Sequence, residues 1–97
     1  MPAYVIADLG EITDRDLLRE YGKGALETFA AAGARVLHAS SKIQVLEGEW
    51  PTDRLVLVEF PDMETLQTWY HSHSYQRLVD MRQAATRGGR LIVFEGA

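Results

Sequence analysis

The sequence predicts a single α+β domain in which strands and helices follow the order β-α-β-β-α-β. Four short apolar runs, rich in β-branched residues, alternate with two longer stretches whose apolar residues recur at helical spacing. The chain has 97 residues, the length of one domain, so residues 1–97 are expected to fold as one unit. The compact solution for this order is a ferredoxin-like antiparallel sheet, strand order 4-1-3-2, with the helices on one face.

The first strand and the first helix are predicted between residues 3 and 33. The stretch AYVIADL at 3–9 is apolar on both alternating faces, which is typical of a strand covered on both sides. Thr13 followed by Asp16 resembles a capping box at the start of the helix, and Gly33 is a natural stop after its end. The apolar face of this helix is expected to consist of Leu17, Leu18, Tyr21, Ala25, Phe29 and Ala32.

The middle of the chain is interpreted as two strands. Residues 34–39 (ARVLHA) and 42–48 (KIQVLEG) are expected to form one bent or bulged strand, interrupted by the serine pair between them, with the turn in EWPTD. Residues 54–60 (RLVLVEF) form the clearest buried strand of the chain, and residues 90–96 (RLIVFEG) form the last one.

The second helix is expected to be broken into two pieces. Asp62 is the expected N-cap of the first piece. A serine, Ser72 or Ser74, can cap the second piece, which ends at the Gly88-Gly89 pair. The break therefore falls inside the stretch WYHSHSYQRL.

Two histidines, His71 and His73, lie at this break. On a strand, two residues of this spacing share a face, whereas on a continuous helix their side chains diverge by about 200°. A surface or dimer-contact histidine is the favoured interpretation, and contact of His71 with a substrate is an alternative. A metal site would need a third or fourth ligand, and only the acidic residues Asp62, Glu64 and Asp80 are near in the sequence, so a metal-dependent site is the least favoured alternative and the prediction names no metal.

The composition excludes several functional classes. No apolar run approaches the ~18 residues that a membrane span needs, and the start of the chain lacks the layout of a signal peptide. The absence of cysteine leaves no disulfide framework and no thiol nucleophile. The net charge is −4 without a basic stripe, which disfavours nucleic acid as a partner. A cytoplasmic protein that binds neither membrane nor nucleic acid is expected.

The sheet is expected to be covered on both faces. All four strands carry apolar residues on both alternations, for example Tyr4 and Ile6 against Val5 and Ala7. A monomer with helices on one face only would expose a large apolar patch. The simplest cover for the second face is another copy of the same sheet, so the sequence predicts a homodimer.

Four stretches of the chain resemble the domain of unknown function 1330 family. They are AYVIADL with TD before the first helix, VLEGEWP at 45–51, RLVLVEFPDME at 54–64 and WYHSHSYQRL at 69–78. The resemblance implies a dimeric α/β barrel, in which the sheets of two chains enclose a barrel with the helices outside. Relatives in this wider superfamily include cofactor-independent monooxygenases, isomerases, haem-modifying enzymes and proteins without known chemistry. The family usually has an Arg-Gly-Gly-like turn in the second strand, and this chain has His38-Ala39-Ser40-Ser41 there.

Candidate catalytic residues come from the strand directions. The first and second strands run opposite to the third and fourth, so Tyr4, Arg35 and His38 lie toward the same end of the sheet as Glu59. A His38–Glu59 pair beside Tyr4 could transfer a proton near neutral pH, and Arg35 could hold an anion. The opposite end is expected to hold ordinary ion pairs between Asp8 and Arg54 or Arg90.

The expected pocket lies between the sheet and the helices. Its candidate catalytic residues are Tyr4, His38 and Glu59, and its candidate substrate-binding residues are Arg35, Tyr21, Trp69, Tyr70 and His71. The aromatic side chains would roof the pocket. The alternative is that Glu59 pairs with Arg35 or His38 for stability alone and that the aromatic residues are core.

The motifs of common enzyme classes are missing. The chain has no G-x-S-x-G elbow, no phosphate-binding glycine loop and no H-E-x-x-H. No cofactor is expected. The sequence predicts a small-molecule-binding protein or a cofactor-independent acid–base or monooxygenase-type enzyme. The alternative is a non-catalytic homodimer with a structural or ligand-binding role.

Overall fold

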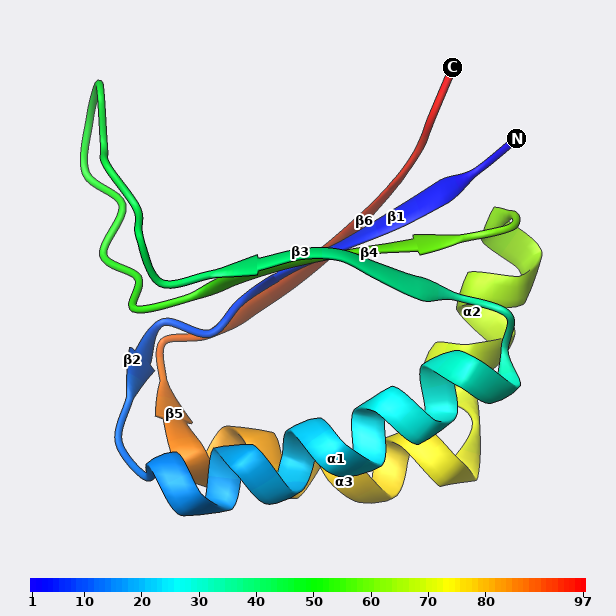
Figure 1. Cartoon of the computed structure of the whole chain (residues 1–97), viewed down its shortest axis with the longest axis horizontal. Helices are drawn as coiled ribbons and strands as arrows, with labels where there is room; N and C mark the ends of the chain where they lie inside the picture. Colours follow the sequence, from blue (N-terminus) through cyan, green and yellow to red (C-terminus); the bar gives the residue numbers. More distant parts are fainter.

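The computed structural model describes all residues, 1–97, as an antiparallel sheet with three helices on one of its faces (Figure 1). The four long strands are β1 (Ala3–Asp8), β3 (Arg35–Ser40), β4 (Leu55–Phe60) and β6 (Arg90–Glu95). They lie in the order β3-β4-β1-β6, which is the predicted order 4-1-3-2 when only the long strands are numbered and the sheet is read from β6. The helices are α1 (Arg15–Ala31), α2 (Met63–His71) and α3 (His73–Ala85).

Strand alternation gives the sheet an inner face toward the helices and an outer face that carries no helix. Val5 of β1 lies opposite Val58 of β4, and both are buried under the helices. The next pair along the ladder, Tyr4 opposite Glu59, faces the other way. Ile92 of β6 lies opposite Ile6 and is 55% exposed. The outer face therefore carries both polar and apolar side chains.

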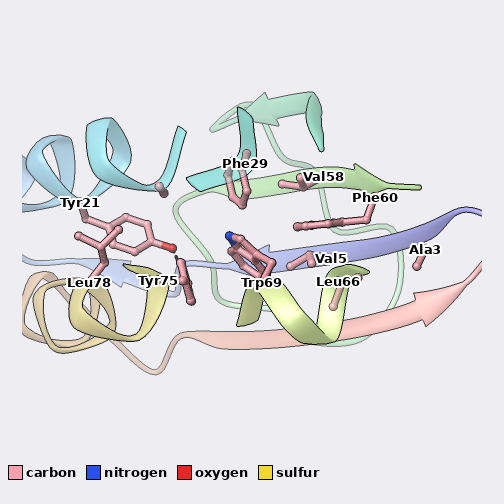
Figure 2. Packing of buried hydrophobic residues seen from close by; sticks show 11 residues of the cluster. Ala3, Val5, Tyr21, Phe29, Val58, Phe60, Leu66, Trp69, Tyr75 and Leu78 are labelled. Carbon is pink, nitrogen blue, oxygen red and sulfur yellow. Dashed lines mark hydrogen bonds between the residues drawn. The ribbon is translucent and has the colours of Figure 1, made fainter. Parts of the chain in front are cut away.

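The core is an aromatic cluster centred on Trp69 of α2 (Figure 2). The Trp69 ring lies 4.1 Å from the Tyr75 ring, 5.0 Å from Phe60 and 5.2 Å from Phe29, measured between centroids. The indole N–H donates a 2.9 Å hydrogen bond to Thr28 Oγ1, so the buried polar atom is satisfied. One residue thus ties α1, α2, α3 and β4 together.

The helix ends follow local side-chain chemistry. The expected capping box at Thr13 is wrong: Asp14 is the N-cap of α1, and its carboxylate accepts from the Leu17 amide at 3.0 Å. Asp62 caps α2 as predicted, accepting from the Thr65 amide at 2.7 Å. Ser72 separates α2 from α3, since its hydroxyl accepts from the Tyr75 amide and donates to the Trp69 carbonyl. This is the break that the sequence predicts between the histidines.

The segment 41–54 is not the second half of a strand, in contrast to the prediction for residues 42–48. It rises from the sheet on the side away from the helices, as an extended loop (Figure 1). The pairing of β3 with β4 ends at Ser40 opposite Leu55, so no neighbouring strand offers hydrogen bonds beyond that point. The irregularity of β3 lies earlier than expected, as a β-bulge between Val36 and His38.

A second, two-stranded sheet was not predicted. It pairs β2 (Glu11–Ile12) with β5 (Thr86–Arg87) and joins the start of α1 to the end of α3. The amides of Thr13 and Asp14 extend this junction by donating to the Ala85 carbonyl. None of the three helices is both long and apolar enough to cross a lipid bilayer.

Candidate functional site

An open cleft of about 540 Å³ lies between the inner face of the sheet and α1. It is lined by 22 residues, 16 of them hydrophobic, so its interior is mainly apolar. Val5, Val56 and Val58 contribute from the strands, and Leu18 and Leu26 contribute from α1. Such a space is uncommon inside a well-packed domain, where few voids exceed the size of a water molecule.

Two hydrogen-bonded tyrosines line this cleft. The hydroxyls of Tyr21 and Tyr75 are 2.7 Å apart, and both side chains are buried. Burial raises the pKa of Tyr21, and the neighbouring Tyr75 raises it further. The hydroxyl therefore stays protonated at neutral pH. Tyr21 therefore takes part in the mutual hydrogen bond as a phenol and not as a phenolate base.

A buried arginine lies behind this pair. Arg82 of α3 is 7% exposed, belongs to no ion pair, and its Nε has no hydrogen-bond partner. Its positive charge acts on Tyr21, where it opposes part of the pKa increase that burial causes. A buried cation without a carboxylate partner is uncommon in a core. Arg82 thus places a positive charge next to Tyr21, which lines the cleft.

The charged residues that line the cleft are all basic. Arg15, Arg19 and Lys23 come from α1, and Arg54 comes from the end of the 41–54 segment. The three from α1 are exposed, so they lie at the mouth of the cleft. Sequence reasoning missed this feature. The spacing of four residues along one helix face was readable, but such a stripe looks like an ordinary solvated surface.

Most of the residues predicted for the pocket do not line it. Tyr21 and Trp69 do. The candidate catalytic residues Tyr4 and Glu59 lie on the outer face, because their neighbours Val5 and Val58 face the helices. The predicted roof of aromatic residues above the Tyr4–Glu59 pair is therefore not formed. The sheet lies between them.

Tyr4, Glu59 and Arg35 form a connected cluster on that outer face. The Tyr4 hydroxyl donates to Glu59 Oε2 at 3.1 Å, and Arg35 contacts Oε1 through Nε at 3.0 Å and Nη2 at 2.9 Å. The Glu59 side chain is 24% exposed and that of Arg35 is 73% exposed, so the ion pair is only partly shielded from water. The bond to Glu59 raises the pKa of Tyr4, and desolvation adds to this increase.

His38 does not pair with Glu59. It lies opposite Leu57 and is exposed, and it makes no hydrogen bond to another side chain. The β-bulge before it keeps it on the outer face with Arg35, but opposite a β4 residue that precedes Glu59 by two positions. The predicted His–Glu proton pair is therefore replaced by an Arg35–Glu59 ion pair.

The remaining predicted residues lie at the α2–α3 break. Tyr70 is half-buried against Tyr75, with ring centroids 5.8 Å apart, and does not line the cleft. His71 and His73 are exposed on either side of Ser72. No group of three or more His, Asp or Glu side chains is arranged to hold a metal ion.

A second polar cluster lies at the other end of the outer face. Asp8 is only 4% exposed and accepts from the Gly10 amide at 2.9 Å, from Trp50 Nε1 at 2.9 Å and from Arg90 at 3.2 Å. Arg90 also lies over the Trp50 ring. The predicted partner Arg90 is thus present, whereas Arg54 bonds to Ser41 instead. This cluster anchors the 41–54 segment to the sheet and makes no contribution to the cleft.

Solved structures of similar fold support the architecture. The RPA0582 protein of unknown function from Rhodopseudomonas palustris matches with a TM-score of 0.78 and 20% identity, over 99% of this chain and 82% of that one. A dimeric ferredoxin-like protein of unknown function from Thermobifida fusca matches with a TM-score of 0.63 and 10% identity, over 97% and 90%. A Caulobacter crescentus protein proposed to be an antibiotic biosynthesis monooxygenase matches with a TM-score of 0.60 and 15% identity, over 99% and 90%.

These identities are low, so the likeness establishes the ferredoxin-like fold and not an activity. None of the functionally curated proteins matches the chain. The model of one family, described as a domain of unknown function (DUF1330), matches residues 2–97, which is almost the whole chain. The protein therefore belongs to the DUF1330 family.

Proposed function

We propose that this protein binds a small, largely apolar organic molecule in the cleft between the sheet and α1. The observation that carries the proposal is the cleft itself: about 540 Å³, open to solvent, with 16 of its 22 lining residues hydrophobic. Ligand sites typically have volumes of several hundred Å³, apolar walls and a few polar groups that fix orientation. The Tyr21–Tyr75 pair supplies such a polar group.

Cofactor-independent chemistry in the same cleft is the catalytic form of this proposal. A protonated tyrosine pair in an apolar cleft stabilises negative charge that develops on a substrate oxygen, as in an enolate. Arg82, behind Tyr21, adds to that stabilisation through its field. The fold that this chain shares with the Caulobacter crescentus protein is consistent with a monooxygenase-type reaction. In this form the tyrosines act on the substrate, while Tyr4, His38 and Glu59 lie outside the cleft.

We also propose that the outer face is covered by a second copy of the chain. Ile92 and Phe94 of the edge strand β6 are 55% and 44% exposed on this face. Edge strands with exposed apolar side chains are seldom left open to water. The dimeric ferredoxin-like neighbour from Thermobifida fusca supports this assembly. A homodimer without turnover remains the alternative function. Tyr4, His38 and Glu59 would then lie at or beside the interface.

Ligand binding in the cleft is tested with the neutral fluorescent dye Nile red and a variant that closes the mouth. Gly22 of α1 lines the cleft, and a Cβ at this position meets nothing within 4 Å, so Gly22→Phe fills open space. Ala30→Phe is the matched control, at an exposed α1 position that does not line the cleft. We expect the wild type and Ala30→Phe to bind the dye and Gly22→Phe to lose binding. Equal binding by all three proteins would refute the proposal.

A further inference from the structure

We infer that the cleft selects apolar molecules that carry one anionic head group, such as a carboxylate, and that basic residues at its mouth hold that head group. This inference rests on the proposed ligand-binding function and adds the ligand's charge to it. It is carried by the distribution of charge around the cleft and by the placement of the basic side chains on two sides of the mouth.

The charge distribution is the first step. The chain has 14 acidic residues and 10 basic residues, so its net charge is −4. The cleft lining reverses this balance: Arg15, Arg19, Lys23 and Arg54 line it, and no acidic residue does. A single-sign cluster beside apolar walls concentrates ligands of the opposite charge, because the field is less screened there than over open surface.

The placement of these side chains is the second step. Arg15, Arg19 and Lys23 follow each other at intervals of four residues, so they form one row along α1. Arg54 lies on the other side of the mouth, where its Nη1 donates to Ser41 at 3.2 Å. Ser41 lines the cleft as well. A head group at the mouth would thus be contacted from the helix and from the sheet.

The basic side chains remain available to a ligand. Arg19 pairs with Asp16 at 3.0 Å and Lys23 with Glu20 at 3.7 Å, but all four of these side chains are more than 60% exposed. Exposed pairs of this kind contribute little and exchange readily for another anion. Arg15 belongs to no ion pair.

The inner end of the cleft explains why the rest of the ligand is apolar. The walls are formed by valine and leucine side chains and by the aromatic core around Trp69. The charge of Arg82 lies behind Tyr21 and does not line the cleft, so it favours an anion in the cleft without binding it directly. A cationic head group would be repelled by the basic residues at the mouth.

The test compares three ligands with the same ten-carbon chain: decanoate, 1-decanol and decylammonium. Each is titrated against Nile red bound to the wild-type protein. We expect decanoate to bind roughly fivefold or more tighter than decylammonium. The preference should shrink when NaCl is raised from about 0.05 M to about 0.5 M, because exposed charges are screened.

Two double variants assign the preference to the mouth. Arg15→Gln/Arg19→Gln removes one unpaired charge and one charge in an exposed ion pair. Arg77→Gln/Arg87→Gln is matched to it, because Arg77 is exposed and unpaired and Arg87 pairs at the surface with Glu11 at 3.4 Å. The first variant should weaken decanoate binding by roughly fivefold and leave 1-decanol unchanged. The second variant should change neither.

The outcomes separate this inference from the function on which it rests. Equal affinity for decanoate and decylammonium, or equal effects of the two double variants, would overturn the anionic preference while ligand binding in the cleft still stood. If the cleft does not bind ligands at all, Nile red binding will instead be insensitive to Gly22→Phe. Preference for decanoate that disappears only in the Arg15→Gln/Arg19→Gln variant would establish the inference.

Discussion

The Tyr4 hydroxyl donates a 3.1 Å hydrogen bond to Glu59 Oε2 directly across the β1–β4 ladder, on the sheet face that carries no helix. Arg35 occupies the other carboxylate oxygen from β3. One carboxylate therefore links three neighbouring strands through side chains as well as through the backbone. The partial exposure of Glu59 limits the strength of this contact.

Replacement of Glu59 tests the strength of this link. Glu59→Gln keeps the shape of the side chain but removes the charge that Arg35 and Tyr4 contact. Since Arg35 is largely exposed, we expect a loss of about 1 kcal/mol in the free energy of unfolding, measured by urea denaturation. Glu95→Gln is the control, at an exposed position without a side-chain partner, and should cost less than about 0.5 kcal/mol. A loss of 3 kcal/mol or more for Glu59→Gln, roughly that of a buried ion pair, would mean that the Arg35–Glu59 pair is buried in solution, as it would be under a second copy of the chain.

The same substitution should shift the titration of Tyr4. Its pKa lies above the ordinary value of 10.0 because its proton is held by Glu59. A group whose pKa is higher in the folded state than in the unfolded state contributes stability that is fully present below its unfolded pKa. That contribution is lost as the pH rises through its folded pKa. We therefore expect Glu59→Gln to lower the pKa of Tyr4 toward 10.0. Ultraviolet absorbance titration detects this, with Tyr4→Phe identifying which phenol titrates.

Asp8 should make the stability of the protein sensitive to acid. Burial acts to raise the pKa of Asp8, but the nearby Thr52 hydroxyl and hydrogen bonds from the Gly10 amide, Trp50 and Arg90 outweigh it and hold the pKa below the ordinary value of 3.8. A group whose pKa is lower in the folded state than in the unfolded state contributes stability that is present above its unfolded pKa. That contribution is lost as the pH falls through its folded pKa.

The Asp8 prediction is measured with Asp8→Asn. At pH 7 this variant should be less stable than the wild type by about 1–2 kcal/mol, because a buried acceptor of several hydrogen bonds loses its charge. The difference should shrink as pH falls below 4, where the wild-type carboxyl also becomes neutral. Asp80→Asn, at an exposed position of α3, is the control for the loss of one carboxylate at the surface. A difference between wild type and Asp8→Asn that stays constant from pH 7 to pH 3 would contradict the prediction.

The order of the strands and the break at Ser72 were predictable because they depend on local chemistry: β-branched runs, an aspartate before a helix and a serine between two helical pieces. The side of the sheet on which Glu59 lies was not predictable. Tyr4 and Ile6 are as apolar as Val5 and Ala7, so alternation places Glu59 with Tyr4 without showing which set the helices cover. A pocket between the sheet and the helices was predicted, but apart from Tyr21 and Trp69 its lining was not, because the lining depends on how side chains of distant segments pack.

Two glycines of α1 should respond in opposite ways to alanine. At Gly22 a Cβ meets nothing, so Gly22→Ala should stabilise the protein by roughly 1 kcal/mol through helix propensity. At Gly24 a Cβ would lie 2.9 Å from Leu78 Cδ2, and Leu78 is only 3% exposed between α1 and α3. Gly24→Ala should therefore gain less than Gly22→Ala or lose stability. Thermal unfolding of both variants measures this, and equal stabilisation would mean that α3 moves away freely.

The outer face makes a prediction about assembly. Ile92 is 55% exposed on the edge strand β6, where it lies opposite Ile6 of β1 on that face. If a second copy covers the face, Ile92→Lys places a charge in the interface, where it lacks a partner. We expect light scattering coupled to size-exclusion chromatography to give the wild type twice the chain mass of 10.9 kDa and the variant the mass of one chain.

Leu26→Lys is the control for this experiment, because Leu26 is 57% exposed on α1 and lies on the opposite side of the sheet. It adds the same charge at an equally exposed apolar position, so it should leave the dimer intact. The two substitutions therefore separate an effect on the outer face from a general effect of added charge. A monomeric wild type would mean that no second copy covers the outer face. A dimer that Leu26→Lys dissociates and Ile92→Lys does not would place the interface on another surface. Dissociation by Ile92→Lys alone would assign the interface to the outer face, with the cleft on the opposite side of the sheet left open to its ligand.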